Sequence, residues 1–279
     1  MKFGVSAFAW TAKFQERHLP LLAWAREAGF DGFEIAMFAP GDLPASSLRQ
    51  AYEESGLECT VCAILPAGIN PISPDASVRR RSIEHLIECV ETAAEIGSHL
   101  LGGPLFAPIG YLPPHRPTGD EMLWAIEAFQ AVGESLDEHD MTLSLEPVNR
   151  AETFFIRTAA EARALCDAIG NPRIGVTIDT FHANIEEKSL PLAIESLGPQ
   201  LKHIHISEND RGVPGTGHVG FPAVIESLKK IGYQGYLTVE GFGYCLQETD
   251  GPGWLWAETG VTPEDVAVKG LAYLKGLLK

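Results

Sequence analysis

The feature that most constrains the fold is a regular alternation of short apolar runs with longer amphipathic segments along the whole chain. The runs have the length and composition of buried strands, and the segments between them place apolar residues at helical spacing. We expect strands over residues 2–7, 32–36, 58–63, 99–102, 142–146, 174–179, 201–205 and 235–240. Helices are expected between them, among others over 19–28, 78–96, 121–139, 158–169, 221–231 and 264–278. This order predicts an α/β fold, the (β/α)8 TIM barrel.

Glycines punctuate this pattern, because several predicted helices end at one just before the next strand. Gly29, Gly56, Gly97 and Gly232 hold these positions, which are typical of a helix C-terminus in the left-handed conformation. No low-complexity linker divides the 279 residues, a length that one barrel uses as a single domain. We therefore expect one domain over residues 1–279, with an open doubly wound sheet as the alternative.

The charge balance bears on the partners of the chain. Lysine and arginine number 21 against 37 aspartate and glutamate residues, which gives a formal net charge of −16. Such a surface repels phosphate backbones and anionic lipids, so we expect neither nucleic acid nor membrane as a partner.

Cysteine usage and the amino-terminal segment indicate the compartment. The five cysteines lack the spacing of a disulfide framework, and Cys59 and Cys62 lie inside a predicted strand, so we expect reduced, buried thiols. The apolar run after Lys2 is short and is interrupted by Gly4 and Ser6, unlike the apolar core of a signal peptide. Together these features predict a cytoplasmic protein.

Polar residues end four successive predicted strands. In a TIM barrel the chemistry takes place at the carboxyl ends of the strands, so these side chains are expected to meet at the barrel mouth. Three carboxylates gathered there would repel one another without a cation. Three oxygen donors and one nitrogen fit Mn²⁺, Mg²⁺ or Co²⁺ better than a thiolate-rich zinc site. The predicted metal ligands are Glu146, Asp179, His205 and Glu240.

Taken singly, each of these residues has an ordinary structural explanation. An acid at a strand end often caps a helix, and a lone histidine is more often structural than a ligand. Their occurrence on four successive strands favours the metal site instead. His203 has the same strand parity as His205 but lies one layer deeper, so we expect it in the core or supporting a ligand.

Three further polar residues follow these strand ends. Glu152, His182 and Arg211 are hydrogen-bonding types suited to the oxygens of a polyol, and we expect them to bind substrate. Their structural alternatives are a helix-start acid for Glu152 and a solvated loop residue for Arg211. We expect Arg211 to contribute little to stability because it lies in a loop.

The segment 215–220 reads Gly-Thr-Gly-His-Val-Gly and matches the glycine pattern of dinucleotide-binding proteins. In that motif the glycines directly follow a strand, whereas here the first glycine comes ten residues after the end of the preceding strand. We expect these glycines to turn the chain, with a phosphate-binding loop as an alternative.

Four segments that carry these residues resemble the D-tagatose 3-epimerase / D-psicose (D-allulose) 3-epimerase family of the xylose isomerase-like TIM barrels. They are LEPVNRAETF at 145–154, IDTFHANIEE at 178–187, HIHISENDRGVPGTGHV at 203–219 and VEGF at 239–242. The second half of the chain is closely similar to the family, and the first half is similar in strand and helix layout only.

The resemblance implies a metal-dependent ketose 3-epimerase. It places the metal, with Mn²⁺ expected, on the four strand-end residues, and it makes Glu146 and Glu240 the acid/base pair. It also implies that Glu152, His182 and Arg211 hold the first carbons of a free ketose of the tagatose, psicose/fructose or ribulose class, in a homodimer or homotetramer.

Two departures from the family leave the sugar open. Gly241 stands where many members have proline, and the loop 106–117 differs from theirs at the expected distal end of the sugar. An aldose–ketose or hydroxypyruvate-type isomerase, an inosose dehydratase and a sugar-binding barrel without catalysis are the alternatives on the same scaffold.

Overall fold

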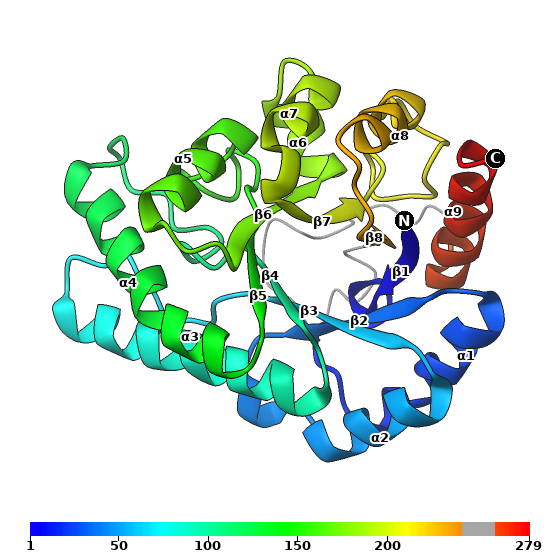
Figure 1. Ribbon diagram of the computed structural model, residues 1–279, viewed down its shortest axis with the longest axis horizontal. Helices are drawn as coiled ribbons and strands as arrows, with labels where there is room; N and C mark the ends of the chain where they lie inside the picture. Colours follow the sequence, from blue (N-terminus) through cyan, green and yellow to red (C-terminus); the bar gives the residue numbers. More distant parts are fainter. Residues whose placement is uncertain (242–259) are drawn as a thin grey trace.

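The protein forms a closed barrel of parallel strands surrounded by helices (Figure 1). The computed structural model describes residues 1–241 and 260–279. Neighbouring strands pair in chain order and β1 pairs with β8, so the predicted (β/α)8 barrel is confirmed and the open sheet is excluded. The strands are β1 Lys2–Ser6, β2 Gly32–Met37, β3 Glu58–Ala63, β4 Leu100–Gly103, β5 Thr142–Leu145, β6 Ile174–Asp179, β7 Leu201–Ile206 and β8 Tyr236–Val239.

The helices lie outside the strands, with their apolar faces against them (Figure 1). The predicted capping glycines all have positive φ, for example 93° at Gly29 and 98° at Gly97, where a side chain would be strained. The helices are α1 Pro20–Ala28, α2 Ala45–Ser55, α3 Ala76–Ile96, α4 Gly119–Glu138, α5 Ala159–Ile169, α6 Thr180–Glu186, α7 Leu190–Leu197, α8 Phe221–Lys230 and α9 Pro263–Leu277.

Small differences from the predicted elements occur where chemistry was expected. Glu146 and Glu240 lie one residue past the ends of β5 and β8, whereas β7 continues one residue beyond His205. The residues directly after β6 form the short helix α6, which carries His182. The expected side chains still lie at the barrel mouth. The strand boundaries differ by only one residue from the expected ones, which changes the backbone pairing at the strand end but not the end of the barrel at which the residue lies.

The inside of the barrel is polar, unlike the apolar layer between strands and helices. Glu34, Thr60, Ser144, Thr177 and His203 are all buried there. The Thr177 hydroxyl donates to the Ser144 hydroxyl at 2.7 Å across two adjacent strands. Buried polar groups of this kind must be hydrogen-bonded or ion-paired to be stable. The polar residues inside the barrel therefore need partners among one another and among the residues at the carboxyl ends of the strands.

The described cysteines agree with the prediction of buried thiols. Cys59, Cys62, Cys89 and Cys166 are buried and free of disulfides, and Cys245 lies outside the described residues. In the part of the chain that the structure describes, no helix is both long and apolar enough to cross a membrane.

Candidate active site

The four predicted metal ligands meet at the carboxyl ends of β5 to β8. The Nδ1 atom of His205 lies 3.2 Å from Oε1 of Glu146 and 3.8 Å from Oε1 of Glu240. Asp179 and His205 are direct partners in the β6–β7 pairing. All four residues are at most 5% exposed. The convergence expected from the strand ends is therefore present, while their role as ligands stays a prediction.

Asp179 uses one carboxylate oxygen for the fold and leaves the other for the site. Its Oδ1 accepts the backbone N–H of Phe181 at 2.9 Å and so caps α6. Its buried Oδ2 has no hydrogen-bond partner among the described residues. A buried carboxylate oxygen without a partner is costly, and a bound cation would satisfy it.

The site concentrates negative charge at buried positions. Burial, reinforced by the neighbouring Glu240, raises the pKa of Asp179 to about 6. Burial likewise raises the pKa of Glu240, although His205 and Arg211 oppose this shift. Carboxyl groups whose charged forms are disfavoured in this way are those that a divalent cation stabilises.

The donor atoms fit a divalent cation of the oxygen-preferring kind. Glu146, Asp179 and His182 offer donor atoms that all lie within 4.8 Å of one another, and so do Glu34, Cys62 and His205. Glu146 and His205, 3.2 Å apart, connect the two groups. Three carboxylates and one or two imidazoles match the preferences of Mn²⁺, Mg²⁺ and Co²⁺.

His182 is held as a hydrogen-bond donor by Asn149. The backbone N–H and the side-chain amide of Asn149 both donate to Nδ1 of His182, at 3.2 and 2.8 Å. Burial and the neighbouring Arg211 hold the pKa of His182 well below its usual range, so the ring is neutral at pH 7. Because the backbone N–H of Asn149 can only donate, Nδ1 accepts and the neutral ring carries its proton on Nε2. Nη2 of Arg211 lies 3.3 Å from Nε2, and since both are then donors they need a shared acceptor between them. This tautomer favours the predicted contact with a sugar oxygen over metal ligation through Nε2.

Arg211 is buried at the site, not solvated in a loop. Its side chain is 9% exposed, its Nη1 donates to Oε2 of Glu240 at 3.3 Å, and its guanidinium lies 4.2 Å from the ring centroid of Phe181. Its pKa is raised because Asp179 and Glu240 outweigh the effect of burial. The expectation that Arg211 contributes little to stability does not agree with this burial. Removing the guanidinium of Arg211 would leave buried carboxylates without their positively charged partner.

Glu152 reaches the site from the loop after β5. The side-chain amide of Asn149 donates to its Oε1 at 2.8 Å, and burial raises the pKa of Glu152. Its carbonyl accepts the N–H of Gly110 at 2.8 Å, which fastens the loop 106–117 to this turn. Tyr111 packs edge-on against Phe154, with ring centroids 5.7 Å apart, in the same contact. The loop whose sequence departs from the family therefore supports a predicted substrate-binding residue.

Glu34 and Asn149 belong to the site but were not predicted from the sequence. Glu34 lies beneath His205 and Asn149 orients both His182 and Glu152. A signal for Glu34 is present, because it is the only acid in the apolar run of β2. Its partners lie on β7, far away in the sequence, so no local pattern reveals them.

The glycines of the segment 215–220 turn the chain, as predicted. The buried carboxylate of Glu208 accepts the N–H of Gly215 at 2.8 Å and that of Val219 at 2.9 Å. Gly215 has a φ of 91°, and a Cβ at Gly217 would collide with the side chain of Glu208. The inward carboxylate occupies the loop, which argues against a phosphate there.

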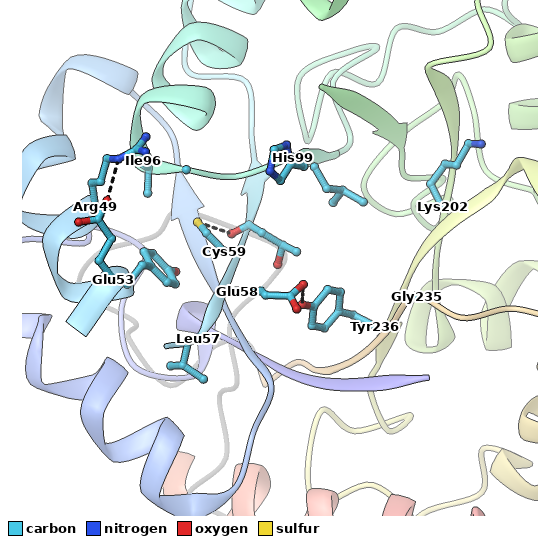
Figure 2. Close-up of a pocket in the computed structure, with 14 residues that line it drawn as sticks. Arg49, Glu53, Leu57, Glu58, Cys59, Ile96, His99, Lys202, Gly235 and Tyr236 are labelled. Atoms are coloured by element: carbon cyan, nitrogen blue, oxygen red, sulfur yellow. Dashed lines mark hydrogen bonds and ion pairs between the residues drawn. The ribbon is translucent and has the colours of Figure 1, made fainter. Parts of the chain in front are cut away.

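A separate cavity of about 600 Å³ lies at the opposite, amino-terminal end of the barrel (Figure 2). Its lining includes Glu58, Leu100 and Tyr236, the first residues of β3, β4 and β8. In Figure 2 the Glu58 carboxylate faces the Tyr236 ring, and it also pairs with Lys2 at 2.5 Å. None of the predicted site residues lines this cavity; they lie at the carboxyl end of the barrel, where the chemistry of TIM barrels takes place.

Comparison with protein families agrees with this geometry. Residues 22–277 match the model of the xylose isomerase-like TIM barrel family. That match covers most of the barrel, including all seven predicted site residues.

Individual relatives and one solved structure make the comparison more specific. The chain is 32% identical to a probable ketose 3-epimerase of Synechocystis sp., over 99% of this chain and 96% of that protein. It is 34% identical to an L-ribulose 3-epimerase of Mesorhizobium japonicum, over 86% and 81%. A crystal structure of D-allulose 3-epimerase from Methylomonas sp. in complex with D-allulose superposes with a TM-score of 0.89 at 25% identity, over 99% and 96% of the two chains. The predicted resemblance is thus confirmed: the chain belongs to the xylose isomerase-like TIM barrel family and, within it, to the ketose 3-epimerases.

Proposed function

We propose that this protein is a metal-dependent epimerase that inverts C3 of a free ketose. The observation that carries the proposal is the convergence of Glu146, Asp179, His205 and Glu240 at one barrel mouth, where the buried Oδ2 of Asp179 accepts no hydrogen bond from the described residues and has only Nε2 of His182 at 3.5 Å and Nη2 of Arg211 at 3.8 Å beside it. Relatives named as ketose, L-ribulose and D-psicose 3-epimerases support the substrate class.

The four strand-end residues would hold the cation. A divalent ion there supplies Lewis-acid stabilisation for the negative charge that develops when the proton next to the C2 carbonyl is removed. We propose Mn²⁺ as this ion, with Mg²⁺ or Co²⁺ as alternatives, because oxygen donors dominate the set.

Glu146 and Glu240 are the proposed acid/base pair. They extend from β5 and β8, with β6 and β7 between them, and both carboxylates approach His205. Two bases on different sides of one centre can remove a proton from one face of C3 and return one to the other, which inversion requires. A single-face isomerase needs only one of them.

Glu152, His182 and Arg211 are the proposed substrate contacts. The Nε2–H of His182 and the guanidinium of Arg211 can donate to O2 of the sugar, and Glu152 can accept from a hydroxyl. Asn149 holds two of the three in place, so the group behaves as one preassembled surface.

The remaining predictions concern the setting of the enzyme. We propose that it works in the cytoplasm as a homodimer or homotetramer, and size-exclusion chromatography with light scattering tests the second point.

A ketose panel tests the function. Protein stripped with EDTA and reloaded with Mn²⁺ is incubated in D₂O with fructose, psicose, tagatose and ribulose, and products are identified by NMR. Deuterium at C3 with inversion supports the proposal. Deuterium at C1 would indicate an isomerase, loss of water a dehydratase, and no exchange a sugar-binding barrel.

A further inference from the structure

Directly beneath the proposed metal site, Glu34 of β2 stands between two histidines of β7. Its Oε1 lies 3.0 Å from Nε2 of His205, and its Oε2 lies 2.9 Å from Nε2 of His203. Glu34 and His203 are each 1% exposed, and His205 is fully buried. One carboxylate thus contacts both imidazoles in the dry interior of the barrel.

No described lysine or arginine pairs with Glu34, and the two imidazoles are its nearest nitrogen contacts. The Thr60 hydroxyl donates to Oε2 at 3.2 Å, which leaves Oε1 facing His205 alone. At present Oε1 and Nε2 of His205 are close but not aligned as a hydrogen bond. A hydrogen bond between them requires the ring or the carboxylate to reorient, and a proton on Nε2 would then satisfy both buried atoms.

The two nitrogens of His205 face different partners. Nε2 faces Glu34, and Nδ1 faces the carboxylates of Glu146 and Glu240 at 3.2 and 3.8 Å. A neutral imidazole can offer a lone pair at Nδ1 only if its proton lies on Nε2. An acceptor at Nε2 therefore decides whether Nδ1 can bind a cation.

We infer that Glu34 is a positioning residue, which accepts the Nε2–H of His205 and thereby fixes the tautomer and ring orientation that present Nδ1 to the metal. This inference rests on the proposed metal site. Carboxylates behind metal-bound histidines commonly act in this way and change metal affinity by about 10–100-fold.

A competing arrangement makes Glu34 itself a ligand. Donor atoms of Glu34, Cys62 and His205 lie within 4.8 Å of one another, which would suit a second ion that shares His205. The two arrangements differ in stoichiometry, because a positioning residue changes the affinity of one ion and a ligand changes the number of ions bound.

Calorimetric titration of the apo protein with Co²⁺ distinguishes them. We expect one Co²⁺ per wild-type chain, and one per chain in Glu34→Gln with affinity about 10–100-fold weaker. Ser144→Ala is the matched control, since it removes a buried hydrogen bond to Thr177 on the same inner surface without contacting His205. It should bind Co²⁺ with the affinity of the wild type.

The tautomer can be read in the wild type alone. In ¹⁵N-histidine-labelled protein loaded with diamagnetic Zn²⁺, long-range ¹H–¹⁵N spectra should show the His205 proton on Nε2, with Nδ1 bound. The signals of His205 are assigned as those missing from the spectrum of His205→Asn. In Glu34→Gln we expect the Nε2 proton signal to shift and to exchange faster with water.

Several results would overturn the inference. A proton on Nδ1 of wild-type His205 would contradict it even if Glu34→Gln failed to fold, and so would unchanged Co²⁺ affinity in a folded Glu34→Gln. Two ions in the wild type and one in the variant would make Glu34 a ligand. Wild-type protein that binds no Co²⁺ would instead refute the proposed metal site.

Discussion

The guanidinium of Arg211 donates to the carboxylate of Glu240 at 3.3 Å, and both side chains are buried. The proposed substrate-binding arginine is therefore paired with a proposed catalytic base. The same guanidinium lies over the Phe181 ring of α6, which fixes its plane. We therefore expect substrate binding and the charge of the proposed acid/base pair to be coupled through this contact.

This pairing predicts that Arg211→Ala impairs both activity and stability. Loss of the donor should reduce kcat/KM by a factor equivalent to about 2–4 kcal/mol. Leaving buried carboxylates unpaired should also lower the free energy of unfolding, by up to about 3–5 kcal/mol. Steady-state kinetics and urea unfolding measure the two effects.

Arg173→Ala is the matched control, because Arg173 pairs with the exposed Asp137 and Asp140 away from the site. It should leave both quantities nearly unchanged. If Arg211→Ala had the same free energy of unfolding as the wild type, the buried ion pairs of Arg211 would not contribute to stability.

Chelation should abolish activity and lower Tm. The cation is expected to bind the folded site and not the unfolded chain, so at 100 times its Kd it stabilises by about 2.7 kcal/mol. Differential scanning calorimetry before and after EDTA treatment, and after Mn²⁺ is restored, gives the shift. Full activity in protein shown by elemental analysis to contain no metal would contradict the account.

The described thiols should be inert in the folded protein. Burial raises the pKa of Cys59, Cys89 and Cys166 to about 12, and raises that of Cys62 well above its usual range. Because the thiolate is the reactive form, Cys245→Ser should show no rapid reaction with a disulfide reagent at pH 8, and four reacting thiols in denaturant. A thiol that reacts within seconds in the folded variant would show that one of these strands or helices opens.

Glu186 should stabilise the protein only above its titration range. Arg150 donates to Glu186 through both its backbone and its side chain, and this outweighs burial and lowers the pKa of Glu186 below its usual range. The pKa of Glu186 is lower in the folded state than in the unfolded state, where it is near 4.3. The ionised carboxylate therefore adds to the free energy of unfolding above pH 4.3, and this contribution is lost as the pH falls through the folded-state pKa.

Glu186→Gln should therefore have a lower Tm than the wild type at pH 7. This difference in Tm, the gap, should shrink as the pH is lowered past about 4. Glu53→Gln removes an exposed ion pair with Arg49 and serves as the control, with no gap expected at any pH. A gap that stays constant from pH 7 to pH 3.5 would show that the carboxylate charge is not responsible.

The barrel and the ring of strand-end residues could be predicted from the sequence because both depend on local patterns. Alternating apolar runs specify strands and helices, and a polar residue at the end of such a run specifies its place at the barrel mouth. Asp179 and His205 illustrate this, since parity and position alone bring them together as cross-strand partners.

What the sequence could not show depends on partners that are distant in the chain. Glu34 in β2 reads as an isolated acid until β7 brings His203 and His205 beside it. The burial of Arg211 has the same origin, because its loop gains its cover from α6 and from the end of β8. Local propensity carries no information about such packing.

The central claim is that Glu146 and Glu240 act on opposite faces of C3. The most direct test incubates Glu146→Gln and Glu240→Gln, each confirmed to bind Co²⁺, with both epimers of the accepted ketose in D₂O, and follows inversion and C3 deuteration by NMR. Glutamine keeps the shape and one oxygen ligand but cannot accept a proton, so each variant should lose inversion by about 10²–10⁴-fold. Each should still exchange the C3 proton of one epimer, and the two variants should select opposite epimers. Normal inversion in either variant, or deuterium at C1 in place of C3, would contradict the two-base account.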